Sequence, residues 1–387
     1  MKTKVIPYGC HQITKSDIDA VVNVLKSEFL TQGPKVIDFE KAFANYIGSK
    51  YAISVSNGTA ALHLSAIALG VGPGKRVISS PLTFAASTNC ILYCGGTVEF
   101  CDVDPKTLLL DINLVRQKLE ASPKGTYAGI IPVDFAGAAV DMEAFRLLAD
   151  EFNLFLLEDS CHAPGGYFID SKGQKQFCGN CNYADAAIFS FHPVKHITCG
   201  EGGMITTNNE ELYQKLLRLR THGITKESKN LNQYHGGWYY EMQDLGYNYR
   251  LSEINAALGL SQLERAEVNL SYRRKIADNY AMSFNSISEV QFMNNDNKGH
   301  AFHLAVIKVK KRRELYDYLK KNLINTQVHY IPIHFHPYYQ KKFKFKVGDF
   351  PVAEEYYQSG LSLPIYPNLS LEENIFVINK IKNFFDN

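Results

Sequence analysis

The first two hundred residues contain two kinds of segment, which differ in how their apolar and polar residues are spaced. Short continuous apolar runs, typical of buried strands, alternate with longer segments whose apolar residues recur three or four positions apart, as in helices. This alternation predicts an α/β fold whose mostly parallel central sheet lies between helices on both faces. The expected strands are residues 51–55, 76–79, 97–101, 128–132, 154–158 and 186–191, and the helices between them include 60–69, 113–120 and 141–151.

The pattern changes near residue 250. Residues 251–280 read as one long or broken helix, and a smaller α+β unit follows it. We therefore expect a large domain over residues 1–250, with an N-terminal segment 1–15, and an interdomain helix with a small C-terminal domain over 251–387. The expected elements of the small unit are strands at 302–309 and around Val328, and helices at 311–322, 352–359 and 371–384.

Composition and charge exclude several classes of function. The 387 residues are 45% hydrophobic and 21% charged, which is typical of globular proteins. A net charge of +2 argues against a nucleic-acid partner. No apolar run is long enough to cross a bilayer, and the start of the chain lacks the apolar core of a secretory signal. We expect a cytoplasmic protein without a membrane partner.

Eight cysteines lie between positions 10 and 199, and one pair has the spacing Cys178-Gly-Asn-Cys181. Such a pair can be half of a zinc site or a redox pair. A zinc site would need a second ligand pair, and neither Cys161-His162 nor His192 lies at the spacing of a standard zinc ribbon. We therefore interpret the cysteines as structural thiols and expect no metal.

The segment Ser56-Asn-Gly-Thr59 joins an expected strand to an expected helix. The N-terminus of a helix presents free backbone N–H groups and a positive dipole end to an anion. Gly58 permits close approach of the backbone, and Thr59 adds a hydroxyl. The segment is a candidate phosphate site, although Asn-Gly is also a common turn.

A carboxylate pair, Glu158-Asp159, ends another expected strand, where open α/β sheets place their ligands. Asp159 could pair with a protonated pyridine nitrogen or could simply cap the following turn. His162, three residues later, could hold Asp159 or stack on a ring, and it could equally be a structural histidine.

One lysine, Lys195, lies in a short loop between the apolar run 186–191 and the glycines Gly200, Gly202 and Gly203. A sheltered lysine near other positive charge can attack an aldehyde and form a Schiff base. Ser190 could reach a phosphate from the end of its strand, and the glycines could turn the backbone sharply beside a cofactor. Phe84 could stack on a pyridine ring or belong to the core.

The order of four segments resembles the DegT/DnrJ/EryC1/StrS family of sugar-nucleotide aminotransferases, which have the fold-type I pyridoxal-phosphate architecture. The resemblance runs from about Ile6 to the C-terminus. The segments that carry it are Ser56-Asn-Gly-Thr-Ala-Ala-Leu62, Glu158-Asp-Ser-Cys-His-Ala163, Ser190-Phe-His-Pro-Val-Lys-His196 and Leu245-Gly-Tyr-Asn-Tyr-Arg-Leu251.

The resemblance implies a role for each matching residue. Lys195 would form the Schiff base with pyridoxal 5'-phosphate, and Asp159 would pair with its pyridine nitrogen. Phe84 would cover one ring face with His162 near the ring. The resemblance implies that Gly58, Thr59 and Ser190 bind the cofactor phosphate. Asn248 would reach the phosphate of the cofactor bound to the partner subunit of a homodimer. Tyr8, His329 and Tyr330 would line the sugar-nucleotide pocket.

Three further segments, 6–9, 28–34 and 328–334, are most similar to family members of pseudaminic acid biosynthesis. The implied reaction moves an amino group from L-glutamate to C4 of a UDP-linked 4-keto-6-deoxy-N-acetylhexosamine. A dTDP- or GDP-linked keto sugar and a non-catalytic cofactor-binding member are the alternatives. Family dehydratases carry His at the lysine position, so Lys195 argues against that activity, and no Gly-x-Gly-x-x-Gly supports a Rossmann oxidoreductase.

Overall fold

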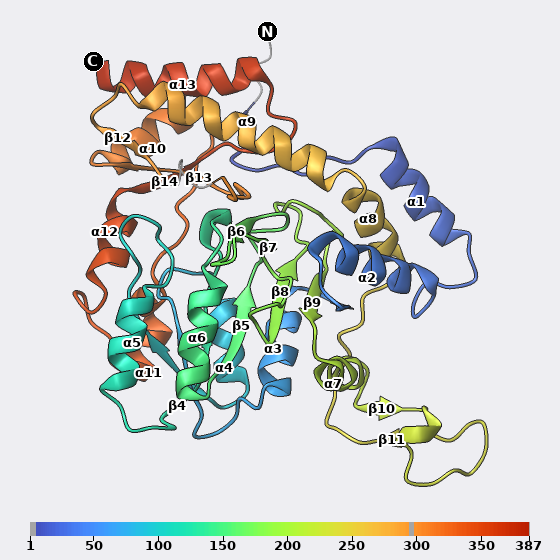
Figure 1. The fold of residues 1–387 in the computed structure, drawn as a ribbon. Coiled ribbons are helices and arrows are strands. Elements are labelled where there is room, and N and C mark those ends of the chain that lie inside the picture. Colours follow the sequence, from blue (N-terminus) through green and yellow to red (C-terminus); the bar gives the residue numbers. More distant parts are fainter. Residues whose placement is uncertain (1–4, 294–297, 387) are drawn as a thin grey trace.

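A seven-stranded sheet forms the centre of the computed structural model, which describes residues 5–293 and 298–386 (Figure 1). The strands run in the order β1-β9-β8-β5-β4-β2-β3, and the five from β8 to β3 are mutually parallel. Only β9 runs against its neighbours β1 and β8. The strands are β1 (Tyr51–Val55), β2 (Arg76–Ser79), β3 (Thr97–Phe100), β4 (Tyr127–Ile131), β5 (Phe155–Asp159), β8 (Ala186–Ser190) and β9 (Gly203–Thr207).

Consecutive residues of the strands point to opposite faces of the sheet, and each face has its own hydrophobic core. Ile131 and Leu157 pack under α3, α4 and α7. Their neighbours Ile130 and Leu156 pack under α5 and α6, while Phe189 packs under α2 and α8. These helices are α2 (Pro34–Ile47), α3 (Gly58–Ala68), α4 (Ala86–Tyr93), α5 (Ile112–Glu120), α6 (Met142–Phe152), α7 (Glu210–Arg220) and α8 (Glu253–Leu263).

The C-terminal part contains a second core around the three-stranded sheet β12-β13-β14. The expected helix over 251–280 is broken into α8 and α9. The expected strand around Val328 is wrong, because Gln327 makes only an isolated bridge to Ser362 and β14 supplies the third strand. The elements here are α9 (Ala266–Phe284), β12 (Val290–Phe292), β13 (Ala305–Val309), α10 (Arg312–Lys321), α11 (Pro337–Phe343), α12 (Pro351–Ser359), β14 (Gly360–Leu363) and α13 (Leu371–Asp386).

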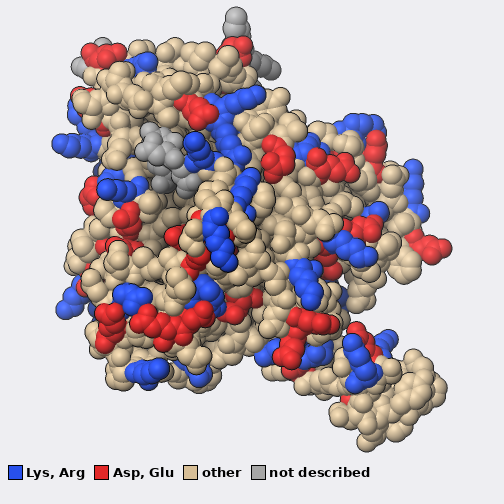
Figure 2. All heavy atoms as spheres, in the orientation of Figure 1, with Lys and Arg blue, Asp and Glu red and all other residues tan. Residues whose placement is uncertain are grey.

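A thin arm leaves the body between α7 and α8, at the lower right of Figure 1. It is built on the two-stranded pair β10 (Ile224–Thr225) and β11 (Glu241–Met242), and its tip carries few charged side chains in the view of Figure 2. Trp238, in the segment between β10 and β11, is 77% exposed, and Tyr234 in the same segment is also exposed. A second small hairpin, β6 (Tyr167–Ile169) with β7 (Lys175–Phe177), lies after β5.

Within the described ranges, no helix combines the length and the apolar character that a membrane span requires.

A buried carboxylate holds the start of α2 against the body. Glu253, at the start of α8, accepts hydrogen bonds from the backbone N–H groups of Gly33, Lys35 and Val36 at distances of 2.8–3.0 Å. These N–H groups belong to the first turn of α2, where no intrahelical acceptor is available. A negative charge is also favoured there by the helix dipole. Glu253 therefore acts as a helix cap supplied from more than two hundred residues away.

Substitution Glu253→Ala should lower the free energy of unfolding by about 2–4 kcal/mol, because it leaves backbone donors without their charged acceptor. Urea denaturation followed by circular dichroism measures the change. Glu264→Ala, at an exposed glutamate just after the same helix, is the matched control and should change stability little. Equal loss in both variants would show that Glu253 has no special role as a cap.

Candidate active site

A cavity of about 670 Å³ opens at the carboxyl ends of β1, β5 and β8. The parallel strands meet at this edge of the sheet, where α/β folds place their ligands. Ten of the eleven site residues predicted from the sequence line it: Tyr8, Gly58, Thr59, Phe84, Asp159, His162, Ser190, Lys195, His329 and Tyr330.

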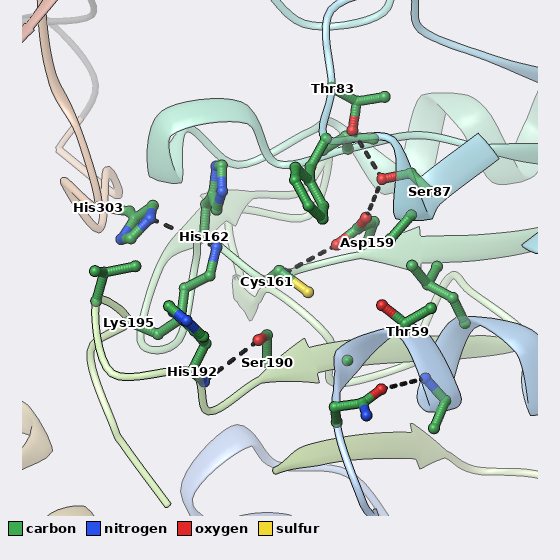
Figure 3. A pocket seen from close by; sticks show the side chains of 18 of the residues that line it. Thr59, Thr83, Ser87, Asp159, Cys161, His162, Ser190, His192, Lys195 and His303 are labelled. Atoms are coloured by element: carbon green, nitrogen blue, oxygen red, sulfur yellow. Dashed lines mark hydrogen bonds between the residues drawn. The ribbon is translucent and has the colours of Figure 1, made fainter. Parts of the chain in front are cut away.

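Asp159 ends β5 as a buried carboxylate on the cavity wall (Figure 3). The Ser87 hydroxyl donates to its Oδ2 at 2.6 Å, and the backbone N–H of Cys161 donates to its Oδ1 at 3.2 Å. Thr83 Oγ1 lies 2.8 Å from Ser87 Oγ and extends this chain of hydroxyls. Asp159 is thus held in one orientation, with its carboxyl group facing the cavity, where it could pair with a ring nitrogen.

Lys195 lies opposite, in the loop that joins β8 to β9 (Figure 3). Its Nζ lies 3.5 Å from His303 Nε2. Burial lowers the pKa of Lys195, and the nearby charge of Arg273 lowers it further, while Cys161 and Asp159 act in the opposite sense. A lysine with a lowered pKa is unprotonated more often and can react as a nucleophile or accept a proton.

The turn from β1 into α3 forms an anion site beside this lysine. Asn57 caps the helix by accepting from Ala60 N at 2.8 Å, which leaves the preceding N–H groups of Gly58 and Thr59 at the cavity wall. A Cβ atom on Gly58 would lie 2.9 Å from Ser190 Cβ, so only glycine lets the two segments approach. The glycines after Lys195 are expected to turn the backbone sharply. Gly200 does so, with φ +77°, but Gly203 is the first residue of strand β9.

His162 has a fixed tautomer. The backbone N–H of Ala136 donates to its Nδ1 at 3.2 Å, so the proton of the neutral ring lies on Nε2 and is directed to Tyr330 Oη at 3.1 Å. Burial lowers the pKa of His162 well below its usual range, and the charge of Lys195 acts in the same direction. The ring is therefore a neutral donor that orients Tyr330.

Aromatic and histidine side chains form the outer wall. His329 is held by Ser362 Oγ at 2.9 Å from its Nδ1, and its ring centroid lies 5.4 Å from that of Tyr8. Phe84 is 60% exposed at the cavity mouth, 6.0 Å from the Tyr330 ring. This placement leaves room for a flat ring and a larger polar group beyond it.

Two residues of the site are absent from the sequence prediction. Ser87 lies in the first turn of α4, and its contact with Thr83, which precedes the helix, has no clear signal in the sequence. His303 comes from the C-terminal part, and no local pattern places it near Lys195. Asn248 lies outside the residues that line this chain's cavity and bridges Thr221 through its backbone. Its role across a dimer stays a prediction.

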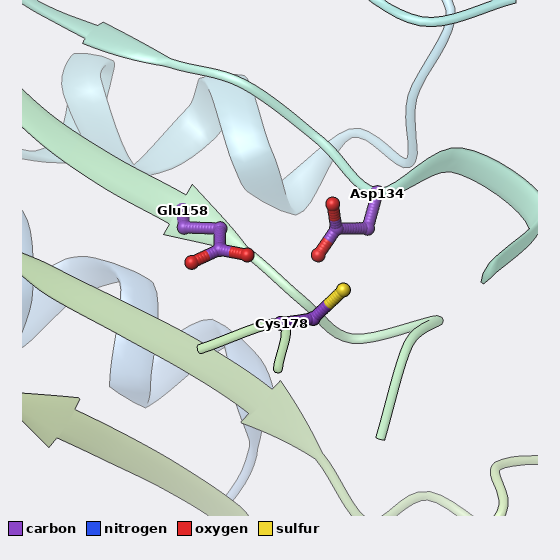
Figure 4. Close-up of side chains that lie close together, drawn as sticks. All are labelled: Asp134, Glu158 and Cys178. Atoms are coloured by element: carbon purple, nitrogen blue, oxygen red, sulfur yellow. The ribbon is translucent and has the colours of Figure 1, made fainter. Parts of the chain in front are cut away.

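The two cysteines of the Cys-x-x-Cys segment do not converge. Cys181 Sγ donates to Thr206 O at 3.2 Å. Cys178 lies instead beside the buried side chains of Asp134 and Glu158, and the potential metal-ligand atoms of these three residues lie within 4.8 Å of one another (Figure 4). Burial raises the pKa of Glu158 well above its usual range and that of Asp134 to about 6. Because two buried like charges repel, the folded structure favours one proton shared between the two carboxyl groups.

The site residues fit pyridoxal phosphate. A fixed carboxylate suits the pyridine nitrogen, a lysine of lowered pKa suits the aldehyde, and the start of α3 at Gly58 suits the phosphate. The fold and the site thus define a pyridoxal-phosphate enzyme.

The model of the DegT/DnrJ/EryC1/StrS aminotransferase family matches residues 11–382, and the chain belongs to this family. It is 40% identical to the spore coat polysaccharide biosynthesis protein SpsC of Bacillus subtilis, over 98% of this chain and 96% of that one. It is 37% identical to the UDP-4-amino-4,6-dideoxy-N-acetyl-beta-L-altrosamine transaminase of Campylobacter jejuni, over 96% and 95%. It is 34% identical to the GDP-perosamine synthase of Escherichia coli O157:H7, over 99% of both.

Solved structures of aminotransferases have the same fold as this chain. Helicobacter pylori PseC, an aminotransferase of pseudoaminic acid biosynthesis, superposes with a TM-score of 0.88 and 30% identity, over 99% of this chain and 100% of that one. Spr1654 of Streptococcus pneumoniae in its PLP form, which is described as a sugar aminotransferase, gives a TM-score of 0.88 and 29% identity, over 99% of both chains. The protein is therefore a pyridoxal-phosphate-dependent sugar aminotransferase, which confirms the fold-type I prediction and the predicted cofactor.

The shared proton of Glu158 and Asp134 makes stability depend on pH. The folded pair binds a proton more tightly than the unfolded chain, so its contribution is full below the unfolded pKa and is lost as pH rises through the folded values. We expect the free energy of unfolding, relative to that of Glu158→Gln, to fall as the pH rises from about 4 through about 6 and above, because the pKa of Asp134 is about 6 and that of Glu158 is raised well above its usual range. Urea titrations at several pH values measure it.

Glu264→Gln is the control for removing a glutamate charge, and its curve of unfolding free energy against pH should run parallel to that of the unmodified protein. Parallel curves for Glu158→Gln as well, or one equivalent of divalent metal bound at Asp134, Glu158 and Cys178 in the purified protein, would contradict the shared proton.

Proposed function

We propose that the enzyme moves the amino group of L-glutamate to C4 of a UDP-linked 4-keto-6-deoxy-N-acetylhexosamine, a step of pseudaminic acid-type biosynthesis. The observation that carries the proposed chemistry is that Lys195, Asp159 and the start of α3 line the same cavity. The likeness to the Campylobacter jejuni transaminase over nearly the whole chain, and to Helicobacter pylori PseC, supports this substrate.

Bound pyridoxal phosphate supplies an electron sink that stabilises a carbanion on the carbon that loses its proton. Asp159, fixed by Ser87 and by the Cys161 N–H, would hold the pyridine nitrogen in its protonated state. The backbone N–H groups of Gly58 and Thr59, with Ser190 Oγ, would hold the phosphate.

Lys195 Nζ would carry the proton as general base and then as general acid. A positioned group of this kind contributes about 10²–10⁴-fold to a rate. Burial favours its unprotonated form, which is the form that accepts a proton. Tyr330, oriented by the Nε2–H of His162, and Tyr8 beside His329 would contact the sugar nucleotide.

We also propose a homodimer in which each site takes Asn248 from the partner. The exposed aromatic residues Trp238 and Tyr234 lie on the arm that precedes Asn248, and a surface of this kind suits a protein contact. A GDP- or dTDP-linked keto sugar is the second candidate substrate, since the Escherichia coli GDP-perosamine synthase matches 99% of the chain.

Incubation of the purified enzyme with L-glutamate and a panel of UDP-, dTDP- and GDP-linked 4-keto-6-deoxy sugars should give an amino sugar from the UDP-linked N-acetylated member, detected by mass spectrometry. Lys195→Ala should lower turnover by about 10²–10⁴-fold or more, whereas Lys341→Ala, at an exposed lysine, should not. Amination of the GDP sugar alone would refute the substrate, and full turnover of Lys195→Ala would refute the lysine's role.

Asn248→Ala should weaken cofactor retention about tenfold, the loss expected for one hydrogen bond to a charged group. Equilibrium dialysis measures the retention, and size-exclusion chromatography measures the dimer. Hybrids of Lys195→Ala and Asn248→Ala subunits provide the sharper test: if Asn248 acts across the dimer, one site of each hybrid holds both defects and the other is intact. Hybrids without a site of full cofactor affinity, or a monomeric active enzyme, would refute the shared site.

A further inference from the structure

Three buried histidines lie close to Lys195: His162, His196 and His303. Their rings form a row, with centroid distances of 4.3 Å between His162 and His303 and 5.7 Å between His196 and His303. Two of them have fixed tautomers. His162 accepts from Ala136 N through Nδ1, and His196 has Nε2 2.8 Å from the carbonyl of Ala301, to which it must donate.

His303 differs from its two neighbours. Its Nε2 lies 3.5 Å from Lys195 Nζ. Within the described parts of the chain, no hydrogen bond to a backbone group fixes its tautomer, and its Nδ1 has no partner, as is also true of His196 Nδ1. A buried imidazole nitrogen without a partner is uncommon and calls for an explanation. Because nothing fixes the tautomer, Nε2 can accept a hydrogen bond from a lysine ammonium or donate one to a neutral lysine amine. His303 is therefore suited to both protonation states of Lys195.

The backbone of His303 is held firmly although it belongs to the C-terminal part. On either side of it, Ala301 N donates to Gly137 O at 2.8 Å and Leu304 N donates to Ala136 O at 3.1 Å. The buried guanidinium of Arg273 also reaches the carbonyl of His303, at 3.5 Å. These bonds fix the position from which the imidazole faces Lys195 (Figure 3).

The charges around Lys195 explain why the nearby acceptor is an imidazole. Burial lowers the pKa of His303 well below its usual range, and the charge of Lys195 lowers it further, so the ring stays neutral. A carboxylate in its place would stabilise the ammonium and retain the proton. The other titratable or charged groups that act on Lys195 or respond to its charge are Asp159, Cys161, His162, His196, Arg273 and His329.

We propose that His303 is a positioning residue that holds the amine of Lys195 whenever that amine is not bonded to the cofactor. The neutral ring keeps the amine at the cavity wall without a counter-charge, and the amine remains free to give up its proton. This inference rests on the proposed role of Lys195.

The test replaces His303 by Asp and by Asn in the full-length holoenzyme and measures Lys195 directly. With the cofactor converted to its aminated form by excess L-glutamate, Lys195 is free, and trace labelling with acetic anhydride followed by peptide mass spectrometry reports its reactivity at each pH. His303→Asp should lower the labelling of Lys195 at neutral pH about tenfold or more, with recovery at alkaline pH. His303→Asn, a neutral acceptor, should stay within about threefold of the unmodified enzyme.

His300→Asp is the matched control, because His300 is a buried histidine of the same segment whose Nδ1 accepts from Phe302 N instead of facing Lys195. Circular dichroism and melting verify that each variant is folded. Unchanged labelling in folded His303→Asp, or an equal effect of His300→Asp, would overturn the proposal. If His303→Asp does not fold, a tenfold or greater loss of labelling in His303→Asn overturns it instead.

The role of Lys195 is tested separately. Borohydride reduction of the cofactor-loaded, unmodified enzyme should attach the cofactor to Lys195. If the label is found elsewhere, the proposed function fails, whatever the His303 variants show.

Discussion

The close contact between three backbone segments at the floor of the cavity is the constraint on which the site depends. A Cβ atom on Gly58 would lie 2.9 Å from Ser190 Cβ, and one on Gly203 would lie 2.5 Å from the carbonyl of Asn57. Both distances are shorter than side chains tolerate. Glycine at these two positions therefore lets the start of α3, the end of β8 and the start of β9 abut, which brings the anion site beside the lysine loop.

The same contact fixes the loop that carries Lys195. The chain leaves the sheet at Ser190 and re-enters it at Gly203, and these two residues pair across the antiparallel strands β8 and β9. Phe191 N then donates to Gly202 O at 2.8 Å, which closes the base of the loop. The loop cannot drift away from the carboxyl end of β5, since β5 pairs with β8 up to Asp159. Sheet register thus sets the spacing between the lysine and the carboxylate.

Much of the large unit could be predicted because its strands are continuous apolar runs, and runs of this kind identify buried parallel strands. Strand β9 escaped prediction because it begins at Gly203, and the neighbouring glycines suggested a turn. The strand expected around Val328 failed because Val328 packs against the C-terminal core, the following His329 and Tyr330 line the cavity, and, within the described residues, only Gln327 forms a bridge to a strand. His303 could not be predicted, since its place depends on tertiary hydrogen bonds to Ala136 and Gly137.

The electrostatics of the cavity follow from this arrangement. The histidines that surround Lys195 are neutral because burial opposes their charging, and the buried guanidinium of Arg273 bonds only to carbonyl oxygens within the described residues. Asp159 and Glu201 are the carboxylates among the described residues that line the cavity, and Asp159 is held by the Ser87 hydroxyl and the Cys161 N–H. A fixed carboxylate on one wall of the cavity, with neutral histidines and the Arg273 guanidinium around Lys195, is the arrangement that the proposed roles of Asp159 and Lys195 require.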